Sequence, residues 1–474
     1  MNLYLLSPEI AVAAFGLLIL LLDLVTPKQT KAALAVLGVV GVVVAAALSA
    51  SLIGVNETAF SGALVVDAFA VYFKLLILFA LGLVLLTSVE YVGRWGLAQG
   101  EYYALVLFAA VGMMLLASTR ELITIYLSLE LTTLALVALV ALARSQPASS
   151  EAGLKYLLLS VLASATLLYG IAILYGLTGT TVLADIAAKL TGGAFGSAAL
   201  IALALVVAGF GFKIAAVPFH MWVPDVYQGA PTPVTAFLSV GSKAAGFAVV
   251  VRVFTVAFAP SEQVWPLVFA VLSALTMTLG NVVALRQSNI KRMLAYSSIG
   301  QAGYAMMGLA ASSAFATSSL LLFLLSYAIT NLGAFAAVIA FSNEIGSDEI
   351  ADYNGLSRRS PLLALVLTLC LVSLAGIPPM VGFVGKLYLF TAVFNQGLVW
   401  LVVLAVLNSA ISVFYYIRPV RNAYFGEPSD DRPMSPALPT KLGLAMAFVC
   451  VLAVGLYPAP ALSAAQAAAV ALLP

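Results

Sequence analysis

Apolar residues fill this chain in long runs, and short polar segments separate the runs at intervals of about 20 to 35 residues. A helix rises 1.5 Å per residue and the hydrocarbon core of a bilayer is about 30 Å thick, so about 20 apolar residues can cross it. The pattern predicts an all-α membrane protein with about 14 transmembrane helices. The first, which no basic residue precedes, is too long for a signal-peptide core and is expected to be retained. The expected bounds are 4–25, 32–53, 64–89, 103–117, 121–142, 153–177, 198–230, 234–258, 266–285, 291–311, 317–342, 361–394, 398–423 and 440–460.

Two of these runs are too long for one straight crossing. The seventh (198–230) and the twelfth (361–394) would each measure about 50 Å as a continuous helix. Both contain prolines near the middle: Pro218 and Pro224 in the seventh, and Pro378 and Pro379 in the twelfth. Proline removes a backbone donor and clashes with the preceding turn. We therefore predict that helices 7 and 12 are broken, with the freed carbonyls facing protein or water.

The two broken helices lie five helices apart, and an odd offset gives corresponding helices opposite orientations. The odd offset predicts two inverted five-helix repeats, helices 4–8 and 9–13, with a transport site where the broken segments meet. The expected divisions are 1–117 (helices 1–4, of which helix 4 at 103–117 begins the first repeat), 118–258 (the rest of that repeat), 259–423 (the second repeat) and 424–474 (a loop and helix 14).

Composition agrees with the membrane class, because 63% of residues are hydrophobic and 8% are charged. The net charge of +2 gives no reason to expect a nucleic-acid partner. With these spans, fourteen of the 21 basic residues lie on the side away from the N-terminus, two on its own side and five within spans. Cytoplasmic loops carry the excess of Lys and Arg. Both termini are therefore expected on the periplasmic side of an energy-transducing membrane, such as a bacterial plasma (inner) membrane.

Few side chains are suited to hold a cofactor. There is one histidine, His220, and the two cysteines, Cys370 and Cys450, lie far apart in apolar runs. No GxGxxG fingerprint and no P-loop occurs. We expect no metal, no redox centre and no nucleotide in this chain.

Four charged residues lie deep inside apolar runs: Glu130, Lys213, Lys243 and Lys386. A charge at the centre of a bilayer costs from about 3 to more than 10 kcal/mol, and such residues are typical of proton or ion paths. Structural alternatives remain: a hydrogen bond between helices for Glu130, and snorkelling to the membrane surface for Lys213. Glu130 and Lys213 are expected to form an ion pair, whose separation would favour release of a proton from the lysine.

Other polar residues in the spans are weaker candidates for a proton path. His220 lies beside the first break and is either a structural hydrogen-bonding residue or a proton carrier. Asp67 and Lys74 are seven residues apart on one helix face, which suggests a structural pair. Arg252 is expected to anchor the far end of the eighth helix.

One stretch, PFHMWVPDVYQGAPTPVTAFLSVGSKAAGFA (218–248), resembles the antiporter-like subunits of respiratory complex I, and its DVYQGAPTPV segment resembles the N subunits of bacterial-type NADH:quinone oxidoreductases. Three further segments resemble the family in the same order along the chain: EAGLKYLLLSVLASATLLYG (151–170), NIKRMLAYSSIGQAGY (289–304) and GIPPMVGFVGK (376–386). The resemblance extends over essentially the whole chain.

The resemblance implies a proton-translocating subunit of a translocase that couples quinone reduction elsewhere to proton transfer. It implies that Glu130 and Lys213 form the coupling pair, that Lys243 links two half-channels, and that Lys386 lies near the exit. It also implies partners: sister antiporter-like subunits, other membrane and peripheral subunits, and lipid. NADH, quinone, flavin and iron–sulfur clusters are expected in those other subunits.

The tenth helix departs from the family pattern, because relatives often carry a Lys or His inside it. Here the interior offers Tyr296, Ser297, Ser298, Gln301 and Tyr304, so a central path would run through hydroxyls, an amide and water. The chain also ends soon after helix 14, without the lateral helix of the largest sister subunit.

Three other functions remain open. The same fold would serve a subunit of a multi-chain sodium/proton antiporter or of a membrane-bound hydrogenase. Paired broken helices also suit a stand-alone transporter of an organic solute. A quinone-reducing enzyme is disfavoured by the lack of redox ligands.

Overall fold

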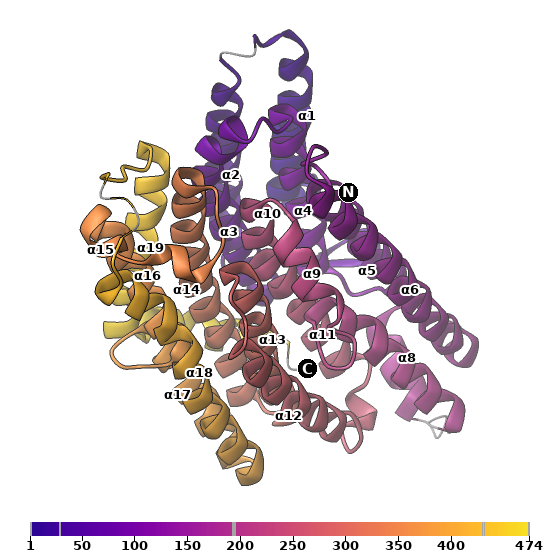
Figure 1. Cartoon of the computed structure of the whole chain (residues 1–474). Coiled ribbons are helices and arrows are strands. Elements are labelled where there is room, and N and C mark those ends of the chain that lie inside the picture. Colours follow the sequence, from indigo (N-terminus) through magenta and orange to yellow (C-terminus); the bar gives the residue numbers. More distant parts are fainter. Residues whose placement is uncertain (1, 28–29, 192–195, 429, 431, 473–474) are drawn as a thin grey trace.

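The computed structural model describes residues 2–27, 30–191, 196–428, 430 and 432–472, which fold into one helical bundle (Figure 1). The predicted all-α membrane fold is confirmed. The elements are η1 (Leu3–Leu6), α1 (Ser7–Val25), α2 (Ala32–Ser51), β1 (Glu57–Ala59), β2 (Leu64–Val66), α3 (Ala68–Arg94), α4 (Gln99–Ser118), α5 (Leu122–Val140), α6 (Pro147–Thr178), α7 (Leu183–Lys189), α8 (Ser197–Ile214), α9 (Trp222–Gly229), α10 (Thr232–Phe237), η4 (Leu238–Ser242), α11 (Lys243–Val256), η5 (Ala259–Ser261), α12 (Trp265–Ala284), α13 (Ile290–Ala310), α14 (Ala314–Ile345), η6 (Ile350–Tyr353), α15 (Leu356–Arg359), α16 (Pro361–Ala375), α17 (Val381–Asn395), α18 (Val399–Phe425), α19 (Leu438–Leu456) and α20 (Ala459–Val470).

Within the described residues, 12 helices are long and apolar enough to cross a membrane. Two further crossings in our prediction are α13, whose polar interior lowers its hydropathy, and the pair α16–α17, whose members have 15 residues each. The count of 14 spans stays a prediction, as do the inverted repeats and the division of the chain at 117, 258 and 423.

Both expected helix breaks are present. The helix α8 ends at Ile214 and α9 begins at Trp222, while α16 ends at Ala375 and α17 begins at Val381. The residue after α8 and the residue after α16 are both left-handed: Ala215 has φ 62° and Gly376 has φ 90°. Exposed residues within the breaks, such as Pro218 and Pro379, place part of each connection on the outer surface of the bundle.

Backbone bridges tie the loops together at the two ends of the bundle. At one end Leu64 pairs with Thr119 and Glu121 pairs with Val182. At the other end Asn289 pairs with Glu349. Each pair joins loops that the predicted alternation of helices puts on the same side of the membrane.

The most buried helices are α13, α14 and the segment from α10 through η4 to α11, which form the centre of the bundle. The helices α12 and α13 approach especially closely. A Cβ at Gly303 would lie 2.4 Å from the backbone nitrogen of Met277, and one at Gly280 would lie 2.4 Å from that of Gly300. Small residues permit such approach between helices that have no hydrophobic driving force in lipid.

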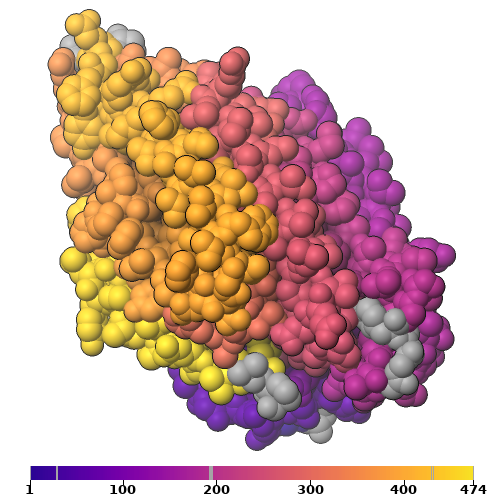
Figure 2. Space-filling view, turned by 90° about the horizontal axis from the view of Figure 1, so that it is seen from below, coloured from indigo at the N-terminus to yellow at the C-terminus, as the bar shows by residue number. Residues whose placement is uncertain are grey.

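Some elements were not expected. The eighth predicted helix contains the π-helical turn η4, and a short hairpin, β1 with β2, precedes α3. After α19 the chain continues into the alanine-rich α20, which packs on α14 and α3; Figure 2 shows this C-terminal segment in yellow near the indigo N-terminal helices. Alanine gives α20 a weak hydropathy signal, and its 12 residues are too few to cross a bilayer.

We expect Gly303→Leu to destabilise the protein, because the new side chain meets the backbone of Met277. Overpacking costs about 1–3 kcal/mol, which should lower the thermal unfolding temperature of the purified protein by several degrees. The matched control is Gly176→Leu on α6, where a Cβ meets nothing within 4 Å. Equal unfolding temperatures for the two variants would contradict the proposed close contact.

Candidate functional site

Lys213 lies in the last turn of α8, immediately before the first break, and points into the bundle. Its Nζ donates a hydrogen bond of 3.2 Å to Thr133 Oγ1 on α5. Its aliphatic stem packs against α11, because a Cβ at Gly246 would lie 3.2 Å from Lys213 Cγ. Lys213 is 5% exposed, which excludes snorkelling toward the membrane surface.

Glu130 lies on α5, one turn before Thr133, and is half-buried. Its carboxylate accepts a hydrogen bond from Ser164 on α6. Among the described residues it forms no ion pair with Lys213, contrary to our expectation. The hydroxyl of Thr133 instead receives the lysine's hydrogen bond, so no direct bond joins Glu130 to Lys213.

Lys243 is the first residue of α11, directly after the π-helical turn η4. Its Nζ donates to the Ser298 carbonyl oxygen at 2.6 Å and also to Ser298 Oγ, both on α13. Ser298 Oγ is in turn 2.7 Å from the hydroxyl of Tyr327 on α14. Single π-helical turns occur frequently at functional sites, and here the turn is followed at once by the buried lysine.

Lys386 lies on α17, just after the second break. Its Nζ donates to the Ala375 carbonyl oxygen and to Ser409 Oγ, both at 2.9 Å, and lies 4.9 Å from the centre of the Tyr304 ring. Because Ala375 is the last residue of α16, the ammonium group meets the negative end of that helix dipole. The break thus supplies Lys386 with an acceptor.

A small cavity lies between the surroundings of Lys243 and those of Lys386. Its volume of about 10 Å³ is near the least that one water molecule needs. Tyr327, which is bonded to Ser298, lines it on one side and Lys386 on the other, and its polar lining also includes Gln301, Ser326, Thr330 and Ser373. Polar groups therefore lead from Lys243 through Ser298, Tyr327 and this cavity to Lys386.

The predicted residues of the tenth helix divide between this path and the periphery. Gln301 lines the cavity, Ser297 is hydrogen-bonded to Tyr416, and the Tyr304 hydroxyl is 3.1 Å from Asn281 Nδ2. Tyr296 instead lies near Arg292, with the guanidinium 5.9 Å from its ring centre.

His220 lies half-buried in the first break, beside the exposed Met221. It forms no hydrogen bond with Lys213, Lys243 or Lys386 among the described residues. His220 Nδ1 is buried without a hydrogen-bond partner among the described residues, so the choice between a structural role and a proton carrier stays a prediction.

The sequence missed several polar side chains that bond to the predicted residues or line the cavity: Thr133, Ser164, Tyr327, Thr330 and Ser409. The signal that could have found Tyr327 and Thr330 is the set of hydroxyl and amide side chains inside the apolar run of α14. The others are single hydroxyl residues, which are common in membrane helices and carry no distinctive pattern.

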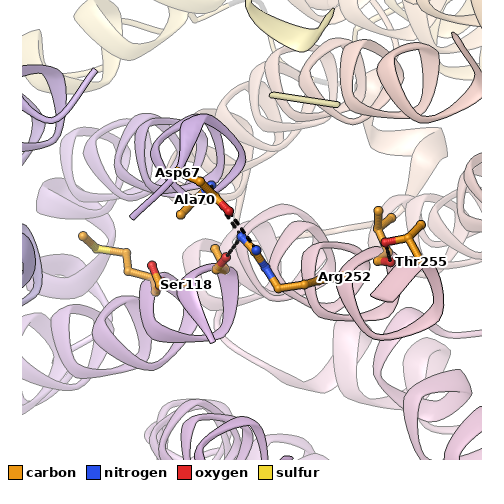
Figure 3. Close-up of polar contacts among 8 residues, drawn as sticks. Asp67, Ala70, Ser118, Arg252 and Thr255 are labelled. Carbon is orange, nitrogen blue, oxygen red and sulfur yellow. Dashed lines mark hydrogen bonds and ion pairs between the residues drawn. The ribbon is translucent and has the colours of Figure 1, made fainter. Parts of the chain in front are cut away.

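The expected pairing of Asp67 with Lys74 is wrong. Asp67 forms a two-pronged ion pair with Arg252, with Nη1–Oδ2 at 2.8 Å and Nη2–Oδ1 at 3.0 Å, and also caps α3 through the amide of Ala70 (Figure 3). Arg252 further donates to the Ala117 carbonyl oxygen. Lys74 is instead paired with Glu9 on α1, at 2.8 Å. The expectation that Arg252 anchors the end of its helix is confirmed.

Comparison with known proteins agrees with this architecture. A family model described as "NADH:quinone oxidoreductase/Mrp antiporter, TM" matches residues 119–412. The chain is 46% identical over 474 residues to the NADH-quinone oxidoreductase subunit N of Heliobacterium modesticaldum, with 99% of each chain covered.

Two solved structures show similar folds. A chain of respiratory complex I from Thermus thermophilus is 36% identical, with a TM-score of 0.82 over 97% of this chain and 99% of that one. A chain of the Mrp complex from Dietzia sp. has a TM-score of 0.85 at 23% identity, over 100% of this chain and 98% of that one, which shows the fold alone. The resemblance found in the sequence is confirmed, and membership of a multi-subunit membrane complex follows.

We expect Arg252→Met to be strongly destabilising, because it leaves the carboxylate of Asp67 buried without its partner. Breaking a buried ion pair costs about 3–5 kcal/mol, whereas replacing both partners by apolar residues of similar volume is often neutral. The double variant Asp67→Leu/Arg252→Met should therefore recover part of the loss in thermal unfolding temperature. A double variant that is no more stable than Arg252→Met would contradict this account.

Proposed function

This chain belongs to the NADH:quinone oxidoreductase/Mrp antiporter transmembrane family, and we propose that it is the proton-translocating subunit N of an NADH:quinone oxidoreductase. The chain is part of an oxidoreductase complex, and its own contribution is proton transfer through the membrane.

The observation that carries this proposal is the connected set of polar groups between Lys243 and Lys386. A proton can leave the Lys243 ammonium toward Ser298 Oγ, while the hydroxyl of Ser298 donates its own proton toward Tyr327. Water in the adjoining cavity would take the proton on toward Lys386. Each step changes only O–H and N–H bonds, and every group involved can both hold and release a proton.

Lys213 and Glu130 are proposed to control the charge of this path. Lys213 packs against Gly246, which lies one turn from Lys243 on α11, so positive charges on both lysines would repel one another. Glu130 is half-buried, so movement of α5 or contact with a neighbouring subunit can change its surroundings. Approach of this carboxylate to Lys213 would hold the charge there, and its withdrawal would favour proton movement away from Lys213.

We propose further that the redox chemistry takes place in other subunits. NADH, flavin, iron–sulfur clusters and quinone would be held there, and this chain would respond to conformational or electrostatic change at its contacts with sister antiporter-like subunits. Both termini would face the periplasmic side of the bacterial inner membrane, because the opposite loops carry most of the basic residues.

A multi-chain sodium/proton antiporter is the second candidate function. The similarity to the Mrp complex extends over the whole chain, yet at 23% identity it indicates a common fold only. The higher identity to the Heliobacterium subunit N, at 46%, favours the oxidoreductase.

In the assembled complex, we expect Lys243→Met to lower redox-linked proton transport about tenfold or more, because the central proton-holding group is lost. Lys243→Arg should be similarly defective, since a guanidinium keeps its charge but does not release a proton. The measurement is acidification of inverted membrane vesicles, followed with a pH-sensitive dye and divided by the rate of quinone reduction.

The matched control is Lys189→Met, which removes an exposed lysine from α7. Assembly is checked by the subunit composition of the purified complex. A normal ratio of protons to electrons in both Lys243 variants would refute the proposed path.

A further inference from the structure

A fifth lysine, Lys291, lies buried at the end of the bundle where α13 begins. The sequence places it at the start of the tenth predicted helix, among the basic residues on the side away from the N-terminus, and its side chain is only 4% exposed. Its Nζ donates a hydrogen bond of 2.7 Å to the Ala230 carbonyl oxygen, between α9 and α10. The same nitrogen lies 3.6 Å from Asp348 Oδ2, and the Asp348 side chain remains 24% exposed. The Asp348 side chain thus reaches the protein surface, and Lys291 lies buried behind it.

Several polar atoms near this pair are buried without a hydrogen-bond partner among the described residues. They include Asp348 Oδ1, Thr232 Oγ1 and Tyr227 Oη. Thr232 and Tyr227 lie two residues after and three residues before Ala230, whose carbonyl oxygen binds Lys291. A buried polar group without a partner costs about 1–3 kcal/mol, and buried waters typically satisfy such groups. Water bonded to these atoms would satisfy them.

This cluster also lies in line with Lys243. Lys291 and Ser298 are seven residues apart on α13, which places them two turns apart on one face of that helix. The phenol of Tyr227 on α9 faces Ser298, and Ser298 is the residue that receives both hydrogen bonds from Lys243. Water between Lys291 and Tyr227 would join these groups into a polar route from the exposed edge of Asp348 to Lys243.

We propose that Asp348 and Lys291 form the entrance at which protons leave the solution on the side of the basic loops and begin to move toward Lys243. This inference rests on the proposed function and adds the residues that feed the path. In the step proposed here, the Lys291 ammonium gives its proton to water beside Tyr227 and becomes a neutral amine. The Asp348 carboxylate takes a proton from solution and passes it to that amine, which restores the starting charges.

The alternative is that Lys291 only holds the connection between α9 and α10 against α13, through the Ala230 carbonyl oxygen. An arginine would serve that purpose, because it keeps the positive charge and the hydrogen-bond donors. An arginine would not serve as a relay, since it does not release its proton at working pH. Lys291→Arg therefore separates the two roles.

The experiment compares Lys291→Met, Lys291→Arg and Asp348→Asn in the assembled complex, in inverted vesicles that present the basic-loop side to the medium. We expect both Lys291 variants to lower redox-linked proton transport about tenfold, and Asp348→Asn to lower it about threefold. Electron transfer from NADH to an artificial acceptor should stay unchanged. The matched control is Arg286→Met, which removes an exposed positive charge from the same end of the bundle and should transport normally.

Normal proton transport in Lys291→Arg would overturn the inference, because it would assign Lys291 a structural role. If neither Lys291 variant assembles, normal transport in Asp348→Asn, which keeps the shape of the side chain, would overturn it as well. The Lys243→Met variant separates this failure from failure of the path. A defect in Lys243→Met together with normal Lys291 variants refutes the entrance alone, whereas normal transport in Lys243→Met refutes the proposed function.

Discussion

An ammonium group buried in an apolar bundle needs hydrogen-bond acceptors, and this need governs how the lysines and the helix breaks are arranged. In a continuous helix most carbonyl oxygens already accept bonds from the following turn, so helix ends are the natural source of free acceptors. Lys386 binds the carbonyl of Ala375 at the end of α16, and Lys291 binds that of Ala230 between α9 and α10. The interrupted helices thus supply main-chain acceptors to both lysines. Lys386 has no carboxylate beside it among the described residues, whereas Lys291 also lies 3.6 Å from Asp348 Oδ2.

The choice of acceptor separates two kinds of buried charge. Arg252 and Lys74 are bonded to the carboxylates of Asp67 and Glu9, and both pairs tie α3 to its neighbours. An opposite charge in direct contact holds an ion in its charged form and fixes its position. Lys213, Lys243 and Lys386 instead bond to hydroxyls and main-chain carbonyls, which impose a weaker preference for the charged form. This difference in partners is consistent with the proposed roles, static anchors for Arg252 and Lys74 and proton exchange for Lys213, Lys243 and Lys386. Lys291 has acceptors of both kinds, the Ala230 carbonyl oxygen and the Asp348 carboxylate.

The sequence was sufficient for the features that depend on local composition. Long apolar runs, mid-run prolines and isolated charges predicted the membrane fold, both broken helices and the buried positions of Lys213, Lys243 and Lys386. Partners from distant segments could not be predicted, because spacing along one helix does not say which other helix faces it. Asp67 and Lys74 do share a face of α3, yet their partners come from α11 and α1. Lys291 was expected at the start of the tenth helix, among the basic residues on the side away from the N-terminus, and nothing in its sequence position pointed to Ala230 or Asp348 as partners.

Ser298 is central to the proposed path, because it lies beside three other polar side chains. It receives hydrogen bonds from Lys243, shares one with Tyr327 and faces Tyr227. A hydroxyl has one proton to donate, so Ser298 Oγ can donate in only one direction at a time. When a proton passes through it, the hydroxyl is left pointing backward and must rotate before another proton can follow. An ammonium at Lys243 favours the orientation in which Ser298 Oγ accepts from the lysine and donates to Tyr327. On the proposed path, the charge state of Lys243 would therefore set the direction in which the Ser298 hydroxyl donates its proton. Rotation of this one hydroxyl would be enough to change that direction, without any movement of the helices.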